Sequence, residues 1–209
     1  MIHYTLTTEG ASDRVLIRHI DWLLEQHSSV EFNGQWANPA SFSSLERDVG
    51  TRMREAVRSF PCNLLFVHRD ADNAGRPARA QEIQDEIAAS GVLPPTVCVI
   101  PVRMTESWLL IEEHAVRKAA GNPRGRAPLQ LPNLNVLEGV ADPKRLLDEA
   151  LLTASETSGR RRRQFSASMP AAKHRVAALI QDVSQLRRLS GFVAFEQELV
   201  NALSQNGWD

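Results

Sequence analysis

The sequence predicts an α/β protein in which an open, mostly parallel sheet is flanked by helices and followed by a C-terminal helical extension. Two nearly uninterrupted apolar runs, 63–67 and 96–102, lack a polar face, which is typical of strands covered on both sides in a parallel sheet. Segments with helical spacing of apolar residues separate these runs from each other and from a β-rich run at 2–7. Strands that alternate with helices favour an open α/β sheet, whose ligand site lies beyond the carboxyl ends of the strands.

Start and stop signals set the expected bounds of the helices. Capping-box spacing at 43–46 opens a helix that ends before Pro61, and Asp142-Pro143 pairs an N-cap residue with a first-turn proline. The expected elements are a strand at 2–7, helices at 12–24 and 43–57, a strand at 63–67, a helix at 77–90, a strand at 96–102, a helix at 105–121, a loop at 122–135, and helices at 142–151, 170–189 and 192–203. We expect a single domain over 1–209, with a core at about 1–121 and the helical extension at about 142–209.

Composition excludes a wholly basic nucleic-acid coat protein and an acidic solvating tail. The chain has 209 residues, with 24 Lys and Arg against 25 Asp and Glu, so any contact with a polyanion must come from a local patch. Cys62 and Cys98 lack the spacing of a metal knuckle and are too few for a disulfide framework, which predicts buried thiols. The sequence shows neither a leader pattern nor an apolar run of roughly 20 residues, so we expect a cytoplasmic protein without a membrane partner.

Acidic residues follow each of the three predicted strands. Glu9-Gly10 follows the first strand, Asp70 and Asp72 follow the second, and Glu106 follows the third. In extended backbone, residues two apart point the same way, so Asp70 and Asp72 could share a hard cation such as Mg²⁺. Such a pair is equally common in surface turns, so it does not decide the function by itself.

Together these motifs resemble the Toprim domain family, in which Glu-Gly follows the first strand, Asp-x-Asp a later apolar strand and a further acidic residue the next. The segment 9–13, Glu-Gly-Ala-Ser-Asp, is similar to the version in overcoming-lysogenization-defect nucleases, which would make Asp13 a further metal ligand or an orienting group. Short stand-alone prokaryotic Toprim-like proteins share an acidic residue ahead of an apolar run, here Glu106 before 108–110. They also share a helix start such as 142–146 and a terminal helix such as 192–203.

The resemblance implies phosphodiester chemistry with Mg²⁺ or Mn²⁺. Tyr4, the only tyrosine, lies inside the first predicted strand, which leaves no topoisomerase nucleophile, and nothing resembles the accessory modules of a primase. Two-metal hydrolysis is therefore the predicted reaction. In this scheme the metal ligands are Glu9, Asp70 and Asp72, with Asp13 and Glu106 completing or orienting the second site, and Lys144 stabilises charge on the phosphate. Asp13, Glu106 and Lys144 each also fit a purely structural role as helix residues, the two acids in a first turn and the lysine in solvent.

A basic segment could supply the contact with DNA or RNA. Residues 143–175 hold eight Lys or Arg against three acidic residues, and Arg160, Arg161, Arg162 and Arg163 are consecutive. A solvated loop or a contact with an acidic subunit explains these arginines equally well. His68 is interpreted as a core histidine rather than a general base.

Three functional hypotheses follow. The leading one is a Toprim-type nuclease, the effector of a prokaryotic antiphage defence system, which could work with a separately encoded ATPase. The sequence has no phosphate-binding Gly-x4-Gly-Lys-Ser/Thr motif, so any nucleotide-driven switching must come from such a partner. The alternative is a non-catalytic subunit that binds nucleic acid or protein on a Toprim-like scaffold. A glycosyltransferase that uses the Asp-x-Asp pair is a weaker third hypothesis.

Overall fold

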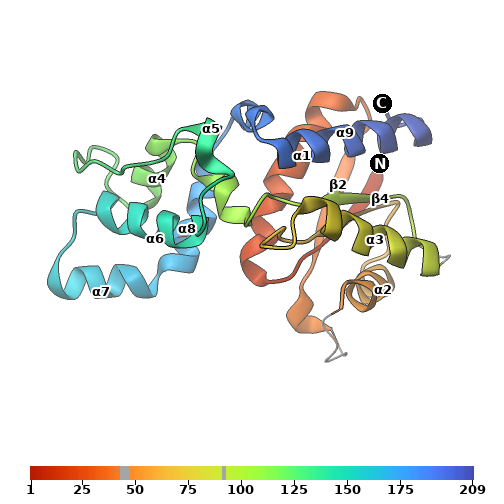
Figure 1. Cartoon of the computed structure of the whole chain (residues 1–209), viewed down its shortest axis with the longest axis horizontal. Helices are drawn as coiled ribbons and strands as arrows, with labels where there is room; N and C mark the ends of the chain where they lie inside the picture. The colour runs from red at the N-terminus through yellow and green to blue at the C-terminus, as the bar shows by residue number, and fades with distance from the viewer. Residues whose placement is uncertain (43–47, 91–92) are drawn as a thin grey trace. The chain divides into compact units, whose positions relative to one another are not determined.

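Four strands pair in parallel to form one open sheet in the order β2-β1-β3-β4 (Figure 1). The computed structural model describes residues 1–42, 48–90 and 93–209. The strands are β1 (Ile2–Thr7), β2 (Phe32–Ala37), β3 (Leu64–His68) and β4 (Thr96–Val99). This sheet and its flanking helices confirm the predicted α/β class and are consistent with a Toprim-like open α/β fold.

Of the two helix starts predicted from capping signals, the one at Asp142-Pro143 lies within the described residues and is confirmed. The α-helices are α1 (Ile17–His27), α2 (Val49–Ser59), α3 (Arg76–Ser90), α4 (Glu113–Ala119), α5 (Leu134–Leu137), α6 (Pro143–Ala154), α7 (Gly159–Ala167), α8 (Met169–Leu179) and α9 (Ser190–Asn206). Short 3₁₀ helices are η1 (Ala11–Leu16), η2 (Pro39–Ser41), η3 (Thr105–Leu109) and η4 (Ser184–Arg188). The Asp142 side chain caps α6 by accepting from the Arg145 N–H (2.8 Å), as predicted.

Several predicted bounds need correction. The helix expected over 105–121 is divided into η3 and α4, and the one expected over 170–189 is divided into α8 and η4. The arginine run forms helix α7, which the sequence analysis did not predict. The capping box predicted at 43–46 lies outside the described residues, and α2 begins after Asp48, whose side chain accepts from the Thr51 N–H (2.8 Å).

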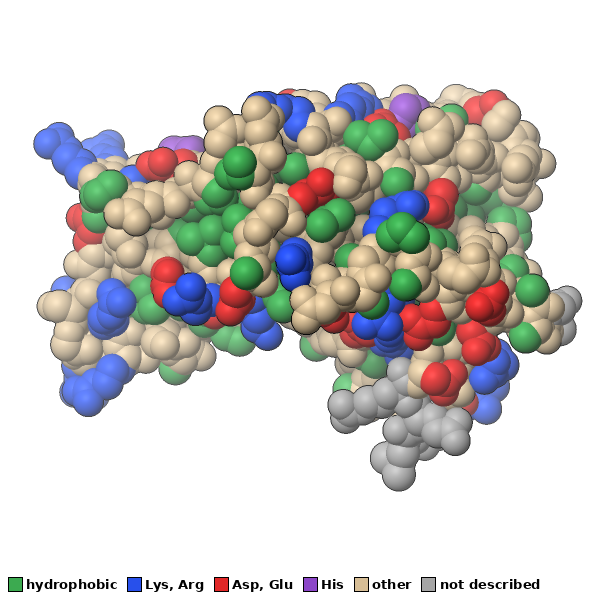
Figure 2. Space-filling model, viewed as in Figure 1, with side chains coloured by type: hydrophobic (Ala, Val, Ile, Leu, Met, Phe, Trp, Pro, Cys, Tyr) green, Lys and Arg blue, Asp and Glu red, His purple; other side chains and the backbone are tan. Residues whose placement is uncertain are grey.

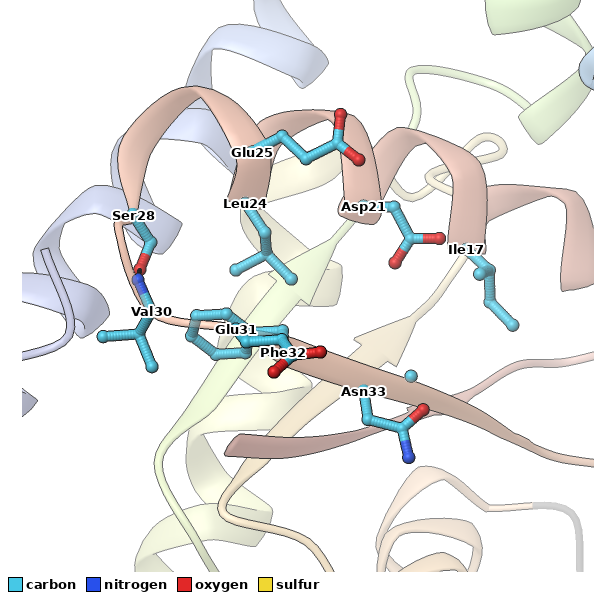
Figure 3. Close-up of a pocket in the computed structure, with 10 residues that line it drawn as sticks. Ile17, Asp21, Leu24, Glu25, Ser28, Val30, Glu31, Phe32 and Asn33 are labelled. Atoms are coloured by element: carbon cyan, nitrogen blue, oxygen red, sulfur yellow. Dashed lines mark hydrogen bonds between the residues drawn. The ribbon is translucent and has the colours of Figure 1, made fainter. Parts of the chain in front are cut away.

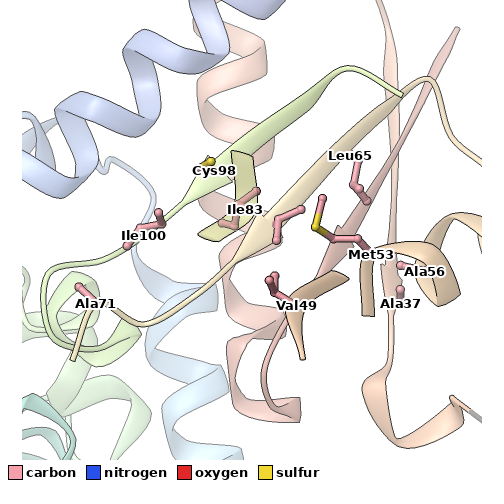
Figure 4. Packing of buried hydrophobic residues seen from close by; sticks show 10 residues of the cluster. Ala37, Val49, Met53, Ala56, Leu65, Ala71, Ile83, Cys98 and Ile100 are labelled. Atoms are coloured by element: carbon pink, nitrogen blue, oxygen red, sulfur yellow. The ribbon is translucent and has the colours of Figure 1, made fainter. Parts of the chain in front are cut away.

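Helices cover both faces of the sheet (Figure 1). On one face, Met53 of α2 and Ile83 of α3 pack against Leu65 and Val67 of β3 in a buried cluster (Figure 4). On the other face, where α1 and α9 lie, the rings of Tyr4, Phe66, Phe195 and Phe192 form a chain of edge-to-face contacts. The alternation of residues along β3 between these two cores explains why this strand is apolar throughout.

Strand β2 was missed by the sequence analysis because it lacks an apolar pattern. Its sequence, Phe-Asn-Gly-Gln-Trp-Ala, pairs with β1 at one edge of the sheet, and only its last residue, Ala37, is fully buried. An edge strand is partly exposed to solvent, so its sequence need not show an alternating apolar pattern. Backbone pairing with β1 is what makes this segment a strand.

The described residues divide into two compact units. Unit 1 contains 1–102 and 190–209, and unit 2 contains 103–189. Helix α9 therefore belongs to the unit that holds the sheet, and the expected boundaries near 121 and 142 do not coincide with the division. Within unit 1, the Glu198 carboxylate of α9 accepts from the backbone N–H of Cys98 (2.9 Å), which satisfies a donor on the edge strand β4.

Both cysteines are free thiols. Cys98 is buried, and its burial, together with Glu198, raises its thiol pKa to about 12, whereas Cys62 is half-buried. No helix in the described part of the chain is long and apolar enough to cross a membrane.

Candidate functional site

The topology of the sheet brings two predicted site loops together in unit 1. From β1 the chain moves to β2 on one side and then crosses to β3 on the other, so the strand order reverses between β1 and β3. In open α/β sheets, ligands bind outside the carboxyl ends of the strands at such a switch point. Thr7 of β1 pairs with Val67 of β3, so Glu9 and Asp70 leave the sheet side by side, and Glu9 Oε2 accepts from the Asp70 N–H (3.2 Å).

Glu9 is held by two arginines that the sequence analysis did not assign to the site. Arg69 Nη1 donates to Glu9 Oε1 (2.6 Å), and Arg52 Nη2 lies 3.8 Å from the same oxygen. Arg69 Nη2 also donates to Glu82 Oε2 (3.1 Å), which Arg79 shares. Figure 2 shows acidic side chains with basic ones among them in the region of α2 and α3. The adjacency of Arg69 to Asp70 in the sequence could have indicated its role, whereas Arg52 comes from a distant helix and gave no signal.

A buried histidine links two more of the predicted residues. His68 Nε2 lies 3.2 Å from Asp70 Oδ1, and His68 Nδ1 lies 3.7 Å from Asp13 Oδ2. Burial alone would lower the pKa of His68, but the hydrogen bond to Asp70 and the charges of Asp13, Asp70 and Glu9 outweigh it and raise the pKa. Asp13 is itself fixed by accepting from the Gly10 N–H (3.1 Å) at the start of η1. His68 thus lies between two carboxylates at the end of β3.

The backbone at Asp72 is not extended, although the sequence analysis expected it to be. Strand β3 ends at His68, and Asp72 adopts a left-handed conformation (φ 46°), so the Asp70–Asp72 segment is not extended as the sequence analysis assumed. Partial burial and the negative charges of Asp70 and Glu9 raise the pKa of Asp72. The charges of Glu9 and Asp70 thus act on Asp72, although the segment 70–72 turns and does not alternate as a strand would.

The donor chemistry of this cluster fits a hard divalent cation. Glu9, Asp70 and Asp72 offer only carboxylate oxygens, the ligands that Mg²⁺ and Mn²⁺ prefer, and their mutual repulsion is what a cation would relieve. Within 1–42, 48–90 and 93–209, however, no three His, Cys, Asp or Glu side chains are gathered in an arrangement that could hold a metal ion. The contact with Arg69 gives a physical reason why Glu9 is not arranged as a metal ligand, because the Arg69 guanidinium occupies Oε1 of Glu9.

The remaining predicted residues belong to unit 2. Glu106 is buried in η3 and accepts from Lys173 Nζ of α8 (3.3 Å), which also lies 2.9 Å from Asp148 Oδ1 of α6. Lys144 lies exposed in the first turn of α6. The lysine that contacts Glu106 is thus Lys173, which the sequence analysis counted only as part of the basic segment.

The arginine run is exposed throughout helix α7, which has no buried residue. Consecutive residues of a helix are rotated by about 100° about its axis. The four arginines at 160–163 therefore point in different directions and do not form a single row. Arg160 and Arg163 share a face, and Arg162 Nη1 turns toward the Leu152 carbonyl (3.5 Å).

A separate cavity of about 610 Å³ lies along α1 and the edge strand β2 in unit 1 (Figure 3). None of the predicted site residues lines it. Its wall includes the carboxyl groups of Asp21 and Glu31, and the Tyr4 hydroxyl donates to Asp21 Oδ1 (2.5 Å). A Cβ at Gly34 would overlap the Tyr4 ring, so glycine is required for this approach. Tyr4 is fully buried within β1, which agrees with its exclusion as a nucleophile.

The site and fold define an open, parallel α/β protein with a cluster of carboxylates and arginines at its topological switch point. No protein-family model, curated protein or solved structure matches the chain.

Proposed function

We propose that the chain is a divalent-metal-dependent phosphodiester hydrolase that acts on DNA or RNA. The observation that carries the proposal is that Glu9 and Asp70 leave neighbouring strands side by side at the switch point between β1 and β3, where their charges also raise the pKa of Asp72. Such crowding of carboxylates is unfavourable unless a cation or a proton neutralises it. Phosphodiester hydrolysis is the chemistry that a clustered carboxylate site of this kind serves with a bound metal.

Each residue of the cluster has a distinct role in this proposal. Glu9, Asp70 and Asp72 would hold Mg²⁺ or Mn²⁺, which supplies the charge that polarises a phosphate oxygen and activates water. His68 orients Asp70 and Asp13 through its two ring nitrogens. The buried guanidinium of Arg52 adds fixed positive charge beside Glu9. The Glu106 and Lys144 assignments stay predictions.

Metal binding and cleavage test the proposal together. The parent protein should nick plasmid DNA or cut RNA with Mn²⁺ or Mg²⁺ and lose this activity in chelator. Glu9→Gln keeps the shape of the side chain but removes its charge, so calorimetric titration should show Mn²⁺ affinity reduced by about tenfold or more, as expected for loss of one ligand charge. In chelator the variant should melt somewhat below the parent, because Glu9 is also the ion-pair partner of the buried Arg69 and Arg52, so the affinities are compared at a temperature where both proteins are folded. Equal Mn²⁺ affinity and cleavage in the parent and in Glu9→Gln would refute the proposed centre.

A non-catalytic nucleic-acid-binding subunit is the second candidate. Two observations favour it: Glu9 is already neutralised by Arg69, and the arginines of α7 are exposed to solvent. Under this alternative, nucleic acid binds without metal, and neither Mn²⁺ nor the Glu9→Gln substitution changes its affinity.

Under either function, helix α7 should contribute to nucleic-acid binding. We expect Arg160→Gln/Arg163→Gln, which neutralises one face of the helix, to weaken DNA binding. The slope of log K against log salt should fall by about 0.9 for each phosphate of duplex DNA that the variant no longer neutralises. Fluorescence anisotropy over a range of salt concentrations measures both quantities. The matched control is Arg124→Gln/Arg126→Gln, which removes two exposed charges elsewhere in unit 2. If the two double variants have the same affinity and slope, α7 has another role.

A further inference from the structure

Two buried arginines beside Glu9 have donor groups that are not used. Arg52 and Arg69 are only 7% and 9% exposed. Arg52 Nε and Nη2 and Arg69 Nε make no hydrogen bond to any described residue, and Arg52 Nη2 approaches Glu9 only to 3.8 Å. Buried guanidinium donors are costly to leave unsatisfied, so these nitrogens are donors that a further anionic acceptor could satisfy once the two side chains move.

The position of Arg69 also conflicts with metal binding at Glu9. Arg69 Nη1 donates to Oε1 at 2.6 Å, and the Asp70 N–H occupies one lone pair of Oε2. A cation bound by Glu9 needs carboxylate lone pairs and is repelled by a guanidinium at this distance. Arg69 has a second carboxylate partner in Glu82, so it can leave Glu9 without becoming unpaired.

We propose that Arg69 is the internal counter-ion of Glu9, which a divalent metal ion displaces, and that the displaced guanidinium then binds a phosphate of the nucleic acid together with Arg52. This inference rests on the proposed function and adds a phosphate-binding role for residues outside the predicted site. Guanidinium groups bind phosphate through paired N–H donors, which suits the unused Nε and Nη2 of Arg52 and, once Arg69 has left Glu9, the Nη1 that this releases together with its unused Nε. Because binding couplings are reciprocal, metal should strengthen nucleic-acid binding and nucleic acid should strengthen metal binding.

The first test compares Mn²⁺ affinities by calorimetry. Arg69→Gln removes the competitor, so it should bind Mn²⁺ about tenfold more tightly than the parent, which corresponds to ~1.4 kcal/mol. The matched control is Arg79→Gln, which removes the same charge from the same cluster but contacts Glu82 and not Glu9. Its Mn²⁺ affinity should change by less than about threefold, which is ~0.7 kcal/mol. Arg69→Lys keeps the charge without the forked donor geometry, so its Mn²⁺ affinity should lie between those of the parent and Arg69→Gln. This variant replaces Arg69→Gln in the comparison if Arg69→Gln does not fold.

The second test measures binding of a fluorescein-labelled single-stranded DNA with Ca²⁺ and with chelator. Ca²⁺ should strengthen binding by the parent, and Arg69→Gln should lose about tenfold in affinity in the presence of Ca²⁺ although it binds metal more tightly. This opposite effect on the two ligands is the signature of the exchange, because a purely structural arginine would weaken both.

The outcomes separate the two proposals. If the parent binds Mn²⁺ and Glu9→Gln does not, but Arg69→Gln and Arg79→Gln have equal Mn²⁺ affinity, the exchange is refuted while the metal centre stands. If the parent binds no Mn²⁺, both proposals fail. If Arg69→Gln binds Mn²⁺ more tightly but binds DNA like the parent, Arg69 is a counter-ion only, and its phosphate-binding role is refuted.

Discussion

Replacing Asp70 with asparagine should reduce metal-dependent cleavage by at least about a hundredfold, which corresponds to ~2.7 kcal/mol of transition-state stabilisation. Asp70 lies two residues after the end of β3, beside Glu9 and in the same loop as Asp72, so the proposed metal centre depends on it most. Asparagine keeps an oxygen for His68 but cannot supply the negative charge that a divalent ion requires.

The same substitution should leave the fold intact. Asp70 adds to the repulsion that raises the pKa of Asp72, and relief of this repulsion offsets the weaker contact that asparagine makes with His68 when metal is absent. Melting followed by circular dichroism in chelator should therefore give a temperature within a few degrees of the parent. The matched control is Asp85→Asn, an exposed position on α3, which should cut at the parent rate. A folded Asp70→Asn protein that cuts like the parent would exclude Asp70 from the mechanism.

Replacing Lys173 with methionine should strongly destabilise unit 2. Lys173 neutralises Glu106, whose side chain is only 9% exposed, and also contacts Asp148. Removing one partner leaves a buried carboxylate without compensation, which costs about 3–5 kcal/mol. For a chain of this length, that loss lowers the melting temperature by roughly 6 to 20 °C.

Thermal unfolding of matched variants tests this role. Lys144→Met removes an exposed lysine from α6 and should change stability by less than about 0.5 kcal/mol. Adding Glu106→Gln to Lys173→Met removes the stranded charge and should recover part of the loss. If Lys173→Met and Lys144→Met have the same melting temperature, the contacts of Lys173 make no net contribution to stability.

Buried strands and capped helices could be predicted from the sequence because their signals are local. The run at 64–68 is apolar throughout since both of its faces pack against helices, and Asp142-Pro143 specifies the start of α6 through its own side chain. Strand β2 and helix α7 were missed for the opposite reason. Neither has a buried apolar stripe, so β2 depends on pairing with β1, and α7 appears as a charged run.

The site was predicted in part. The motifs at Glu9 and Asp70 indicated two acidic loops, and the pairing of β1 with β3 brings them together as parallel strands require. The same motifs did not indicate that Arg52, from α2, would lie beside Glu9, nor that Glu106 would contact Lys173. These partners are separated from the motifs by tens of residues, and no local pattern connects them.

The sequence by itself determined the α/β class, the parallel strands and the positions of the acidic residues at strand ends, because hydrophobic periodicity and capping act over a few neighbouring residues. Only the tertiary structure decided how those charges are compensated. Arg69 neutralises Glu9, His68 lies between Asp13 and Asp70, and Asp72 turns into a left-handed conformation. Charge compensation depends on distances of a few ångströms between side chains from different elements, and such distances exist only after the strands have paired and the helices have packed on them.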